Sequence, residues 1–298
     1  MINVSPRQLQ VFVETVGAGS LRGAAERLHL TQPAASMALA EMERQLGGPL
    51  FDRLRGRLRL NPRGRELLPL AQELLERHAE FGRAAAGAGG PLGGELRIGT
   101  SNTVGNYRVG ELLGDFVRAQ PQVAVRLRVD NTETIASALL AHDLDVACVE
   151  GPVLHPELEV LPWREDALVA CAPPGHALAR RRTLSAGDFA GATWILREPG
   201  SATRAQTEQV LARLPAAGGR LELAQVEAIK QAVAAGLGIA LLPEIAVRDA
   251  VAAGRLRVLR TPFLKPLLQR RLSLLLHRRR YRGALLEAFL RATIHRSP

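Results

Sequence analysis

The stretch Thr31-Gln32-Pro33 begins a predicted helix whose leading outward side chains are small or polar. A threonine cap followed by a proline in the first turn is a typical helix start. The first two outward turns then present Gln32, Pro33, Ser36 and Met37. A face this slim fits the major groove of DNA, where Gln32 and Ser36 can hydrogen-bond base edges and Thr31 can bind a phosphate. These five residues are therefore candidate DNA-binding residues.

Arginine occupies every second position in the stretch that follows this helix. Residues 51–60 read FDRLRGRLRL, which predicts a short hairpin with a glycine at its turn. The row of Arg53, Arg55, Arg57 and Arg59 would lie along phosphates or a minor-groove edge, as the wing of a groove-reading helix does. Two alternatives stay open. Short helices joined by a tight turn are common in ordinary cores, and charges also guard solvated edge strands.

Polar side chains gather again at later points where predicted strands end or pass into helices. Hydroxyls and amides at helix N-termini suit an anion, and an arginine adds a full charge. Small-molecule sites in α/β proteins lie at such connections. The candidate ligand-binding residues are Thr100, Ser101, Asn102, Thr103, Asn131, Thr132, Glu150, Arg197, Ser201, Thr203 and Arg204. The alternative for each serine or threonine is plain N-capping, and Glu150 could simply end its strand.

Motifs of catalysis are missing from the sequence. Neither lysine follows a glycine, so there is no Walker loop, and no complete GxGxxG occurs. The stretch from Gly99 to Thr103 lacks the last glycine of a nucleophile elbow. The seven histidines form no HExxH and no metal-binding spacing with cysteine, and His142 is expected at the surface or in a loop. We therefore expect no enzymatic activity, no cofactor and no metal site.

The candidate DNA-binding helix needs a scaffold, and the first sixty residues predict one. Residues 5–8 read as a capping box, and apolar residues recur at helical spacing from Leu9 to Val16. A second amphipathic helix follows Ser20. Asn61-Pro62 then begins a long helix. Its apolar seam, which requires a partner, consists of Leu67, Leu70, Leu74, Leu75, His78 and Phe81.

From Glu95 onward the pattern changes to strands alternating with helices, which predicts an α/β unit. The strands are expected to open at Leu96 and Ile98 and to recur near residues 123–129, 144–151, 193–196, 221–226, 238–243, 255–259 and 272–276. Cys148 and Cys171 lie in apolar runs of this unit, where a buried free thiol is the usual state.

Positive charge is concentrated at the two ends of the chain. Lys plus Arg outnumber Asp plus Glu by 10 to 5 in residues 1–65 and by 12 to 1 in residues 255–298. Such an end can mark a nucleic-acid surface, but a general preference for arginine would produce the same excess. Neither a signal peptide nor a membrane-spanning apolar stretch is recognisable. A cytoplasmic location without membrane contact is therefore expected.

The first 65 residues resemble the winged helix-turn-helix of LysR-type transcriptional regulators. The resemblance is carried by AAERLHLTQPAAS, EMERQLG and PLFDRLRGRLRLNPRG, which follow the family pattern nearly position by position. It implies a mostly α N-terminal winged helix-turn-helix with a long linker helix, followed by an α/β two-lobed effector domain like a type 2 periplasmic binding protein. The expected parts are residues 1–61 for DNA binding, 62–86 for the dimerising linker helix, 87–94 for a Gly-rich hinge and 95–298 for the effector domain.

The resemblance also implies how the parts cooperate. Lobe one is expected to comprise residues 95–163 and 269–298, with lobe two formed by residues 164–268. The segments NTETI and REPGS resemble most closely the branch that includes sulfur-responsive and carbon-fixation regulators. The expected partners are double-stranded promoter DNA, a small anionic effector such as sulfite, sulfate, a carboxylate or a sugar phosphate, and further copies of the chain in a dimer or tetramer, with RNA polymerase as a further candidate.

Overall fold

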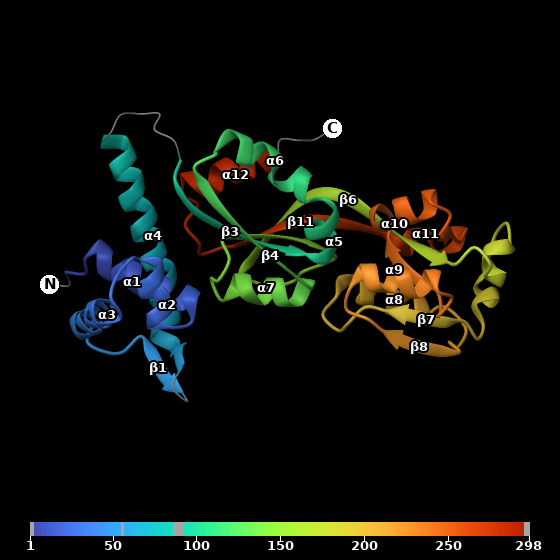
Figure 1. Ribbon diagram of the computed structural model, residues 1–298, viewed down its shortest axis with the longest axis horizontal. Helices are drawn as coiled ribbons and strands as arrows, with labels where there is room; N and C mark the ends of the chain where they lie inside the picture. The colour runs from blue at the N-terminus through green and yellow to red at the C-terminus, as the bar shows by residue number, and fades with distance from the viewer. Residues whose placement is uncertain (1–2, 55–56, 86–91, 295–298) are drawn as a thin grey trace.

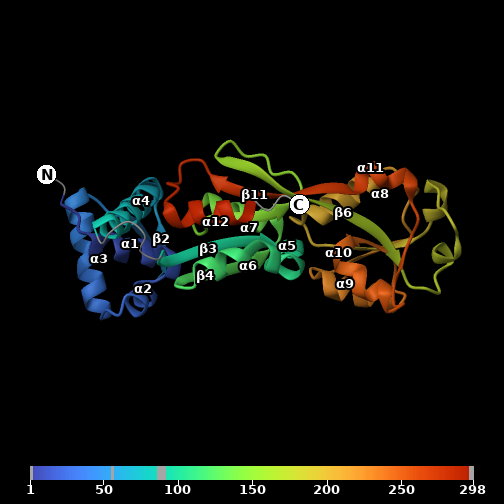
Figure 2. The ribbon, with the colours of Figure 1, turned by 90° about the horizontal axis from the view of Figure 1, so that it is seen from above.

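The computed structural model of the protein describes residues 3–54, 57–85 and 92–294. An N-terminal helical unit, a first α/β lobe and a second α/β lobe follow one another along the longest axis (Figures 1 and 2). No helix within these residues is both long and apolar enough to cross a membrane.

The N-terminal unit contains α1 (Pro6–Ala18), α2 (Leu21–Arg27) and α3 (Gln32–Leu46). Ser5 and Gln8 form the predicted capping box of α1, and Ser20 and Thr31 cap α2 and α3. Gly19 and Gly47 end α1 and α3 in the left-handed conformation, which glycine adopts without steric cost. The apolar stripes of the three helices face one shared core.

A hairpin of β1 (Phe51–Leu54) and β2 (Arg57–Leu60) follows α3. Its antiparallel register pairs Phe51 with Leu60 and Leu54 with Arg57. The Phe51 ring contacts the Phe12 ring edge-on, with 5.7 Å between centroids, so the hairpin is packed against α1.

Helix α4 (Pro62–Ala85) continues through Pro69 and leaves the N-terminal unit (Figure 1). The predicted seam splits between two environments. Leu67 and Leu75 pack against the core of the N-terminal unit, whereas Leu70, Leu74 and Phe81 are 55%, 56% and 75% exposed. The second half of α4 therefore presents an apolar surface to solvent.

Lobe one is built around β4 (Val123–Asp130), β3 (Gly94–Ser101) and β5 (Val146–Glu150), which are parallel neighbours in this order. Helices α6 (Val109–Ala119) and α12 (Ala284–Ile294) cover one face, with an edge-on contact between Phe116 and Phe289. Helix α7 (Thr132–Leu140) covers the other face, and α5 (Asn102–Tyr107) follows β3.

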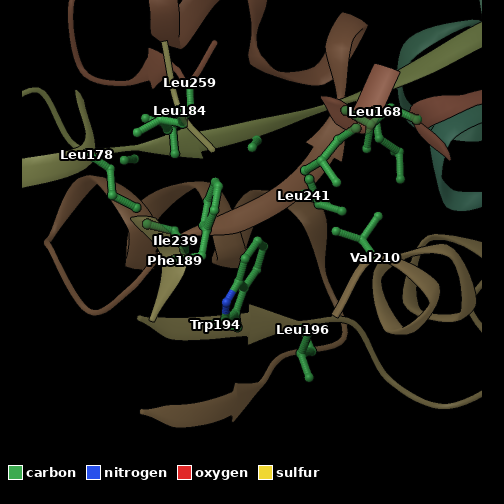
Figure 3. Close-up of a cluster of buried hydrophobic side chains, with 14 residues drawn as sticks. Leu168, Leu178, Leu184, Phe189, Trp194, Leu196, Val210, Ile239, Leu241 and Leu259 are labelled. Carbon is green, nitrogen blue, oxygen red and sulfur yellow. The ribbon is translucent and has the colours of Figure 1, made fainter. Parts of the chain in front are cut away.

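Lobe two holds β7 (Thr193–Leu196), β8 (Gly219–Glu222), β9 (Ala240–Pro243) and β10 (Arg257–Val258). Its helices are α8 (Ala202–Leu211), α9 (Val226–Ala234), α10 (Glu244–Ala252) and α11 (Lys265–Leu268), with short 3-10 turns at Ala177–Arg180, Ala186–Phe189 and Pro262–Leu264. Trp194 and Phe189 stack at 5.7 Å in the centre of its core (Figure 3).

Two long antiparallel strands join the lobes. Strand β6 (Leu158–Ala172) and strand β11 (Gln269–His277) pair along the full length of β11, and β11 also pairs with β5 of lobe one. Beyond this pairing, β6 continues into lobe two, where it pairs with β9 and β10. The expected lobe boundary at residues 163 and 164 thus lies inside a continuous strand.

One local prediction is wrong. The strand expected at residues 221–226 ends at Glu222, because its partner β7 offers only four residues for pairing, and Val226 already begins α9. His142 lies in the loop between α7 and β5, as expected, and its side chain is buried there, with 8% of the residue exposed. The backbone of His142 is left-handed, with φ 60°, as is that of His29, with φ 52°. The His142 ring packs against the His277 ring, with 4.2 Å between the ring centroids. Both cysteines are buried and unpaired, as predicted.

Candidate functional site

The leading face of α3 is directed to solvent. Thr31 caps the helix by accepting a hydrogen bond from the backbone N–H of Ala34 at 3.4 Å. The side chains of Thr31, Gln32, Pro33, Ser36 and Met37 are all exposed, Met37 by 73%. The opposite face buries Ala35, Leu39 and Met42 in the core of the N-terminal unit. The packing therefore leaves the predicted DNA-reading face free for a ligand.

The hairpin beside α3 has the strands expected of a wing. Arg59 is exposed on β2, directly across from Asp52 on β1. Arg55 lies outside the described residues, as do the side chains of Arg53 and Arg57. Of the predicted arginine row, the structure thus places the side chain of Arg59 alone.

A second polar cluster forms where β3, β4 and β5 end. Glu150 is 2% exposed, and both Ser101 and Thr103 donate hydrogen bonds to its carboxylate, Thr103 at 3.1 Å. The Thr132 hydroxyl donates to the Glu150 backbone carbonyl at 3.2 Å. Residues from three strand ends therefore converge, and Glu150 is the negative centre of the group.

Thr100 and Asn102 are buried beside this cluster. A Cβ added to Gly105 would lie 2.7 Å from the Thr100 hydroxyl oxygen, so this hydroxyl faces the backbone of α5. The Asn102 backbone carbonyl accepts from the Asn106 side chain at 2.9 Å. Asn131 caps α7 by accepting from the Thr134 N–H at 2.9 Å.

Of the predicted residues of lobe two, Ser201 and Thr203 lie at the start of α8, whereas Arg204 is held in ion pairs. Ser201 caps α8, and Thr203 is 1% exposed at the start of that helix. Arg204 instead pairs with Glu208 at 2.6 Å and Glu222 at 2.9 Å. The positive charge of Arg204 is therefore largely neutralised within lobe two.

Arg197 is 2% exposed and keeps part of its hydrogen-bonding capacity. Its Nε and Nη2 donate to Glu198 at 2.7 Å each. Among the described residues, its Nη1 has no hydrogen-bond partner. Arg197 directly follows β7 of lobe two, and its backbone carbonyl accepts a hydrogen bond from Arg204 at 2.7 Å.

Arg270 joins the two lobes and was missed in the sequence analysis. Its Nη2 donates to the Thr103 hydroxyl at 3.1 Å, and its Nη1 donates to the Thr203 hydroxyl at 2.9 Å. Its Nε donates to Asp166 at 2.7 Å, and both side chains of this ion pair are at most 3% exposed. The alternation of β11 could have indicated that Arg270 is buried, because it lies two residues before the buried Leu272 and therefore on the same face of the strand.

Three more contacts cross between the lobes. The backbone N–H of Glu133 donates to the Gly200 carbonyl at 3.2 Å, and Asn131 donates to the Pro199 carbonyl at 3.4 Å. The Tyr107 hydroxyl donates to Glu227 at 2.5 Å. Burial and Glu227 both raise the pKa of Tyr107, so the phenol stays protonated and remains a donor.

A groove of about 1080 Å³ opens between the lobes on the side of α7. Thr132, Ser201, Arg204 and Arg270 contribute polar groups to its lining. Much of the remaining wall is apolar and includes Ala136, Leu140, Val153, Leu154, Val160 and Leu267. A small molecule of mixed polarity could bind here beside the buried cluster.

The chain matches two families of known proteins. Residues 6–65 match the family described as "Bacterial regulatory helix-turn-helix protein, lysR family", and residues 89–297 match the "LysR substrate binding domain". YeiE of Escherichia coli strain K12, named as an uncharacterized HTH-type transcriptional regulator, is 37% identical over 290 residues, with 97% of each chain covered.

Solved structures share the fold. A full-length OxyR from Pseudomonas aeruginosa aligns with a TM-score of 0.78 at 24% identity, covering 98% of this chain and 95% of that one. The regulatory domain of CcmR from Synechocystis PCC6803, in complex with 2-PG, aligns with a TM-score of 0.62 at 28% identity, covering 68% and 96%. The chain therefore belongs to the LysR family, as a DNA-binding transcriptional regulator with an effector-binding domain and not an enzyme.

Proposed function

We propose that this regulator reads its promoter with the leading face of α3 and responds to a small anion bound between the lobes. The exposed side chains of Thr31, Gln32, Pro33, Ser36 and Met37 support the first part, because a slim polar face at the start of a helix fits a major groove. Gln32 and Ser36 supply base contacts, and the wing arginines Arg53, Arg55, Arg57 and Arg59 supply contacts to phosphates.

The observation that carries the anionic effector is the buried Arg197, whose Nη1 lacks a partner among the described residues. Thr132 and Ser201 stand at the N-termini of α7 and α8, where backbone N–H groups favour negative charge. The bound 2-PG of the similar CcmR domain is compatible with this class of ligand. The remaining proposed effector residues are Thr100, Ser101, Asn102, Thr103, Asn131, Glu150, Thr203 and Arg204.

Glu150 restricts how such an anion can bind. An anion beside this carboxylate is favoured only if donors separate the two charges. Ser101 and Thr103 already donate to Glu150, so the anion must take its donors from lobe two and from helix N-termini. Arg197 does not line the groove, but its unpartnered Nη1 is a charged donor available for that role, and closure of lobe two onto lobe one would deliver it.

The exposed surface of α4 supports assembly of the regulator through this helix. Leu70, Leu74 and Phe81 would be covered by α4 of a second copy, placing two DNA-binding units on two half-sites. Ligand binding can change promoter binding only through different affinities for two arrangements of this assembly. RNA polymerase is a further partner of the proposed complex, and the cytoplasm is its proposed location.

Calorimetry of the full chain with sulfite, sulfate, a panel of carboxylates, sugar phosphates and 2-PG tests the effector. At least one anion should bind, and Arg197→Gln should weaken it by about tenfold or more, since a charge-assisted hydrogen bond is lost. Arg213→Gln, which changes an arginine elsewhere in lobe two, should leave affinity unchanged. Binding of neutral or cationic compounds alone would refute the anionic class.

The DNA-binding face is tested on a duplex selected from random sequences by the purified chain. Gln32→Ala and Ser36→Ala should each weaken binding to this duplex by about fivefold or more, because a good base contact contributes about 1–3 kcal/mol. Binding to unrelated DNA should change little. Gln122→Ala, an exposed glutamine of the effector domain, is the control. Unchanged binding of both α3 variants would refute this assignment.

A further inference from the structure

The arginine-rich segment after β11 pairs with other parts of the protein, although its composition alone could have indicated a nucleic-acid surface. Arg278 donates to the Pro156 carbonyl at 3.1 Å. Arg279 lies 3.7 Å from Glu157, and Arg282 pairs with Glu159. The segment from His277 to Ala284 is therefore a structural connection, and Arg280 determines what it connects.

Arg280 links α4 to lobe one. Its Nη1 donates to Gln72 at 2.8 Å, and its Nη2 donates to Glu76 at 2.6 Å. The same Nη2 lies 2.9 Å from Asp145, which also pairs with Arg97 at 2.7 Å. The Arg280 side chain is 8% exposed and that of Asp145 is 4% exposed. Water therefore screens this ion pair weakly, unlike an ordinary surface pair.

The contact continues along one face of α4. Gln72, Glu76 and Glu80 follow one another at four-residue spacing and so share a face of the helix. Glu80 accepts hydrogen bonds from the Tyr281 hydroxyl at 2.8 Å and from the Ala284 backbone N–H at 3.0 Å. Figure 2 shows α4 next to the end of lobe one from which this segment emerges. The face of α4 from Gln72 to Glu80 is thus held mainly by one short segment, and the Gln72 side chain also donates to the His142 carbonyl of lobe one at 3.4 Å.

The other end of β11 lies at the junction of the lobes. Arg270 contacts Thr103 of lobe one and Thr203 of lobe two, and Arg280 follows ten residues later. Strand β11 is hydrogen-bonded to β6 and β5 between these points. At about 3.3 Å per residue, the strand from Arg270 to His277 forms a stiff connection of about 23 Å, and a turn at residues 278–280 leads from it to α4.

Space between the N-terminal unit and lobe one leaves room for movement. A cavity of about 700 Å³ is lined by Val13 and Gly17 of α1 on one side and by Arg97 and Leu127 of lobe one on the other. Because these surfaces are not closely packed, the pairing of α4 with residues 280–284 has more influence on the angle between the two units.

We propose that β11 and the segment from His277 to Ala284 transmit lobe movement to α4, with Arg280 as the residue that positions the DNA-binding unit. This inference rests on the proposed function, in which ligand binding moves the lobes. A change at the Thr203–Arg270 contact shifts β11, Arg280 moves with the strand, and α4 follows through Gln72 and Glu76.

A double-mutant cycle measured as affinity for the selected duplex tests this coupling without a known effector. Thr203→Val removes the lobe-two partner of Arg270, and Arg280→Gln removes the charge that holds α4. We expect Thr203→Val to change DNA affinity by about fivefold or more in the wild-type background. A fivefold change is the lower end of the range that coupling between two sites ordinarily produces. In the Arg280→Gln background the same change should have less than about a twofold effect.

Two further variants separate positioning from folding. Arg280→Lys keeps the charge and should restore most of the response to Thr203→Val. Arg279→Gln is the matched control, because Arg279 is 78% exposed, neighbours Arg280 and pairs with Glu157 instead of α4. When Arg279→Gln is combined with Thr203→Val, the effects of the two substitutions on DNA affinity should be additive.

Hydrogen exchange of the α4 backbone supplies a second readout in the same full-length variants. Arg280→Gln should speed exchange around Gln72 and Glu76, whereas Arg279→Gln should not. Additive effects in the cycle, or no effect of Thr203→Val in the wild-type background, would overturn the proposed coupling. Failure of every anion to bind in calorimetry would instead overturn the proposed effector while leaving the result of the cycle intact.

Discussion

Replacement of Arg270 by methionine should destabilise the effector domain strongly. The substitution keeps an apolar stem of similar length but removes the guanidinium that pairs with Asp166 at 2.7 Å. Asp166 would then be a buried carboxylate whose remaining cation is Arg108, 3.9 Å away. Thr103 and Thr203 would also each lose a hydrogen-bond donor.

The expected magnitude follows from the burial of this pair. Both side chains are at most 3% exposed, so little solvent screening reduces the interaction. Breaking a buried ion pair by removing one partner costs about 3–5 kcal/mol, because the other charge is left uncompensated. For a domain of this size, such a loss should lower the unfolding temperature by about 6–20 °C.

Thermal and urea unfolding of the full chain, followed by circular dichroism, would measure this loss. Arg271→Met is the matched control, because Arg271 is the neighbouring arginine on the exposed side of β11 and its replacement should cost less than about 0.5 kcal/mol. A double variant with Arg270→Met and Asp166→Leu should recover much of the loss, since neither charge then remains buried. A loss below about 1 kcal/mol, or additive effects of the two substitutions, would refute the reasoning.

Further predictions concern protonation, packing and thiol reactivity. Burial lowers the pKa of His142 to about 4, below its ordinary value of 6.5, so the unfolded chain binds the proton more tightly and stability is lost as pH falls. Urea titrations should show that the free energy of unfolding decreases by about 2 kcal/mol from pH 7 to pH 5. The variant His142→Asn, whose asparagine tolerates the left-handed backbone, should flatten this pH dependence. An equally steep decrease in the variant would contradict the prediction. Gly64→Ala should reduce the unfolding free energy by about 1–3 kcal/mol in a thermal melt, because its Cβ would lie 2.3 Å from the Leu50 carbonyl oxygen; a neutral effect would show that this contact relaxes freely. Burial raises the pKa of Cys148 and brings that of Cys171 to about 12, so a thiol reagent at pH 8 should label neither residue until the protein unfolds; rapid labelling of the native chain would disprove this.

Local sequence was sufficient to predict the N-terminal unit. Caps at Ser5, Ser20 and Thr31 and the apolar stripes between them act within one or two helical turns. Their effect on structure is therefore readable from neighbouring residues. The exposure of Gln32 and Ser36 follows in the same way, because burial of Ala35 and Leu39 fixes the rotation of α3.

The resemblance to a two-lobed effector domain implied that polar residues after several strands would meet at one cleft. Parallel strands bring their carboxyl ends to one edge of a sheet, so Thr103 and Thr132 both reach Glu150. Their individual partners were not predictable. Periodicity places a residue on a face of its element, but the group that it meets belongs to another segment.

Tertiary structure decided the long-range contacts. Arg270 meets partners 67, 104 and 167 residues away in the chain, and Arg280 meets Gln72 across 208 residues. Arg204 looked equally suitable for an anion, but it is neutralised by Glu208 and Glu222. The sequence by itself determined which elements form and which of their faces are apolar. The pairing of buried charges depended on how those elements pack, because Coulomb and hydrogen-bond energies depend on distances in space and not on separation along the chain.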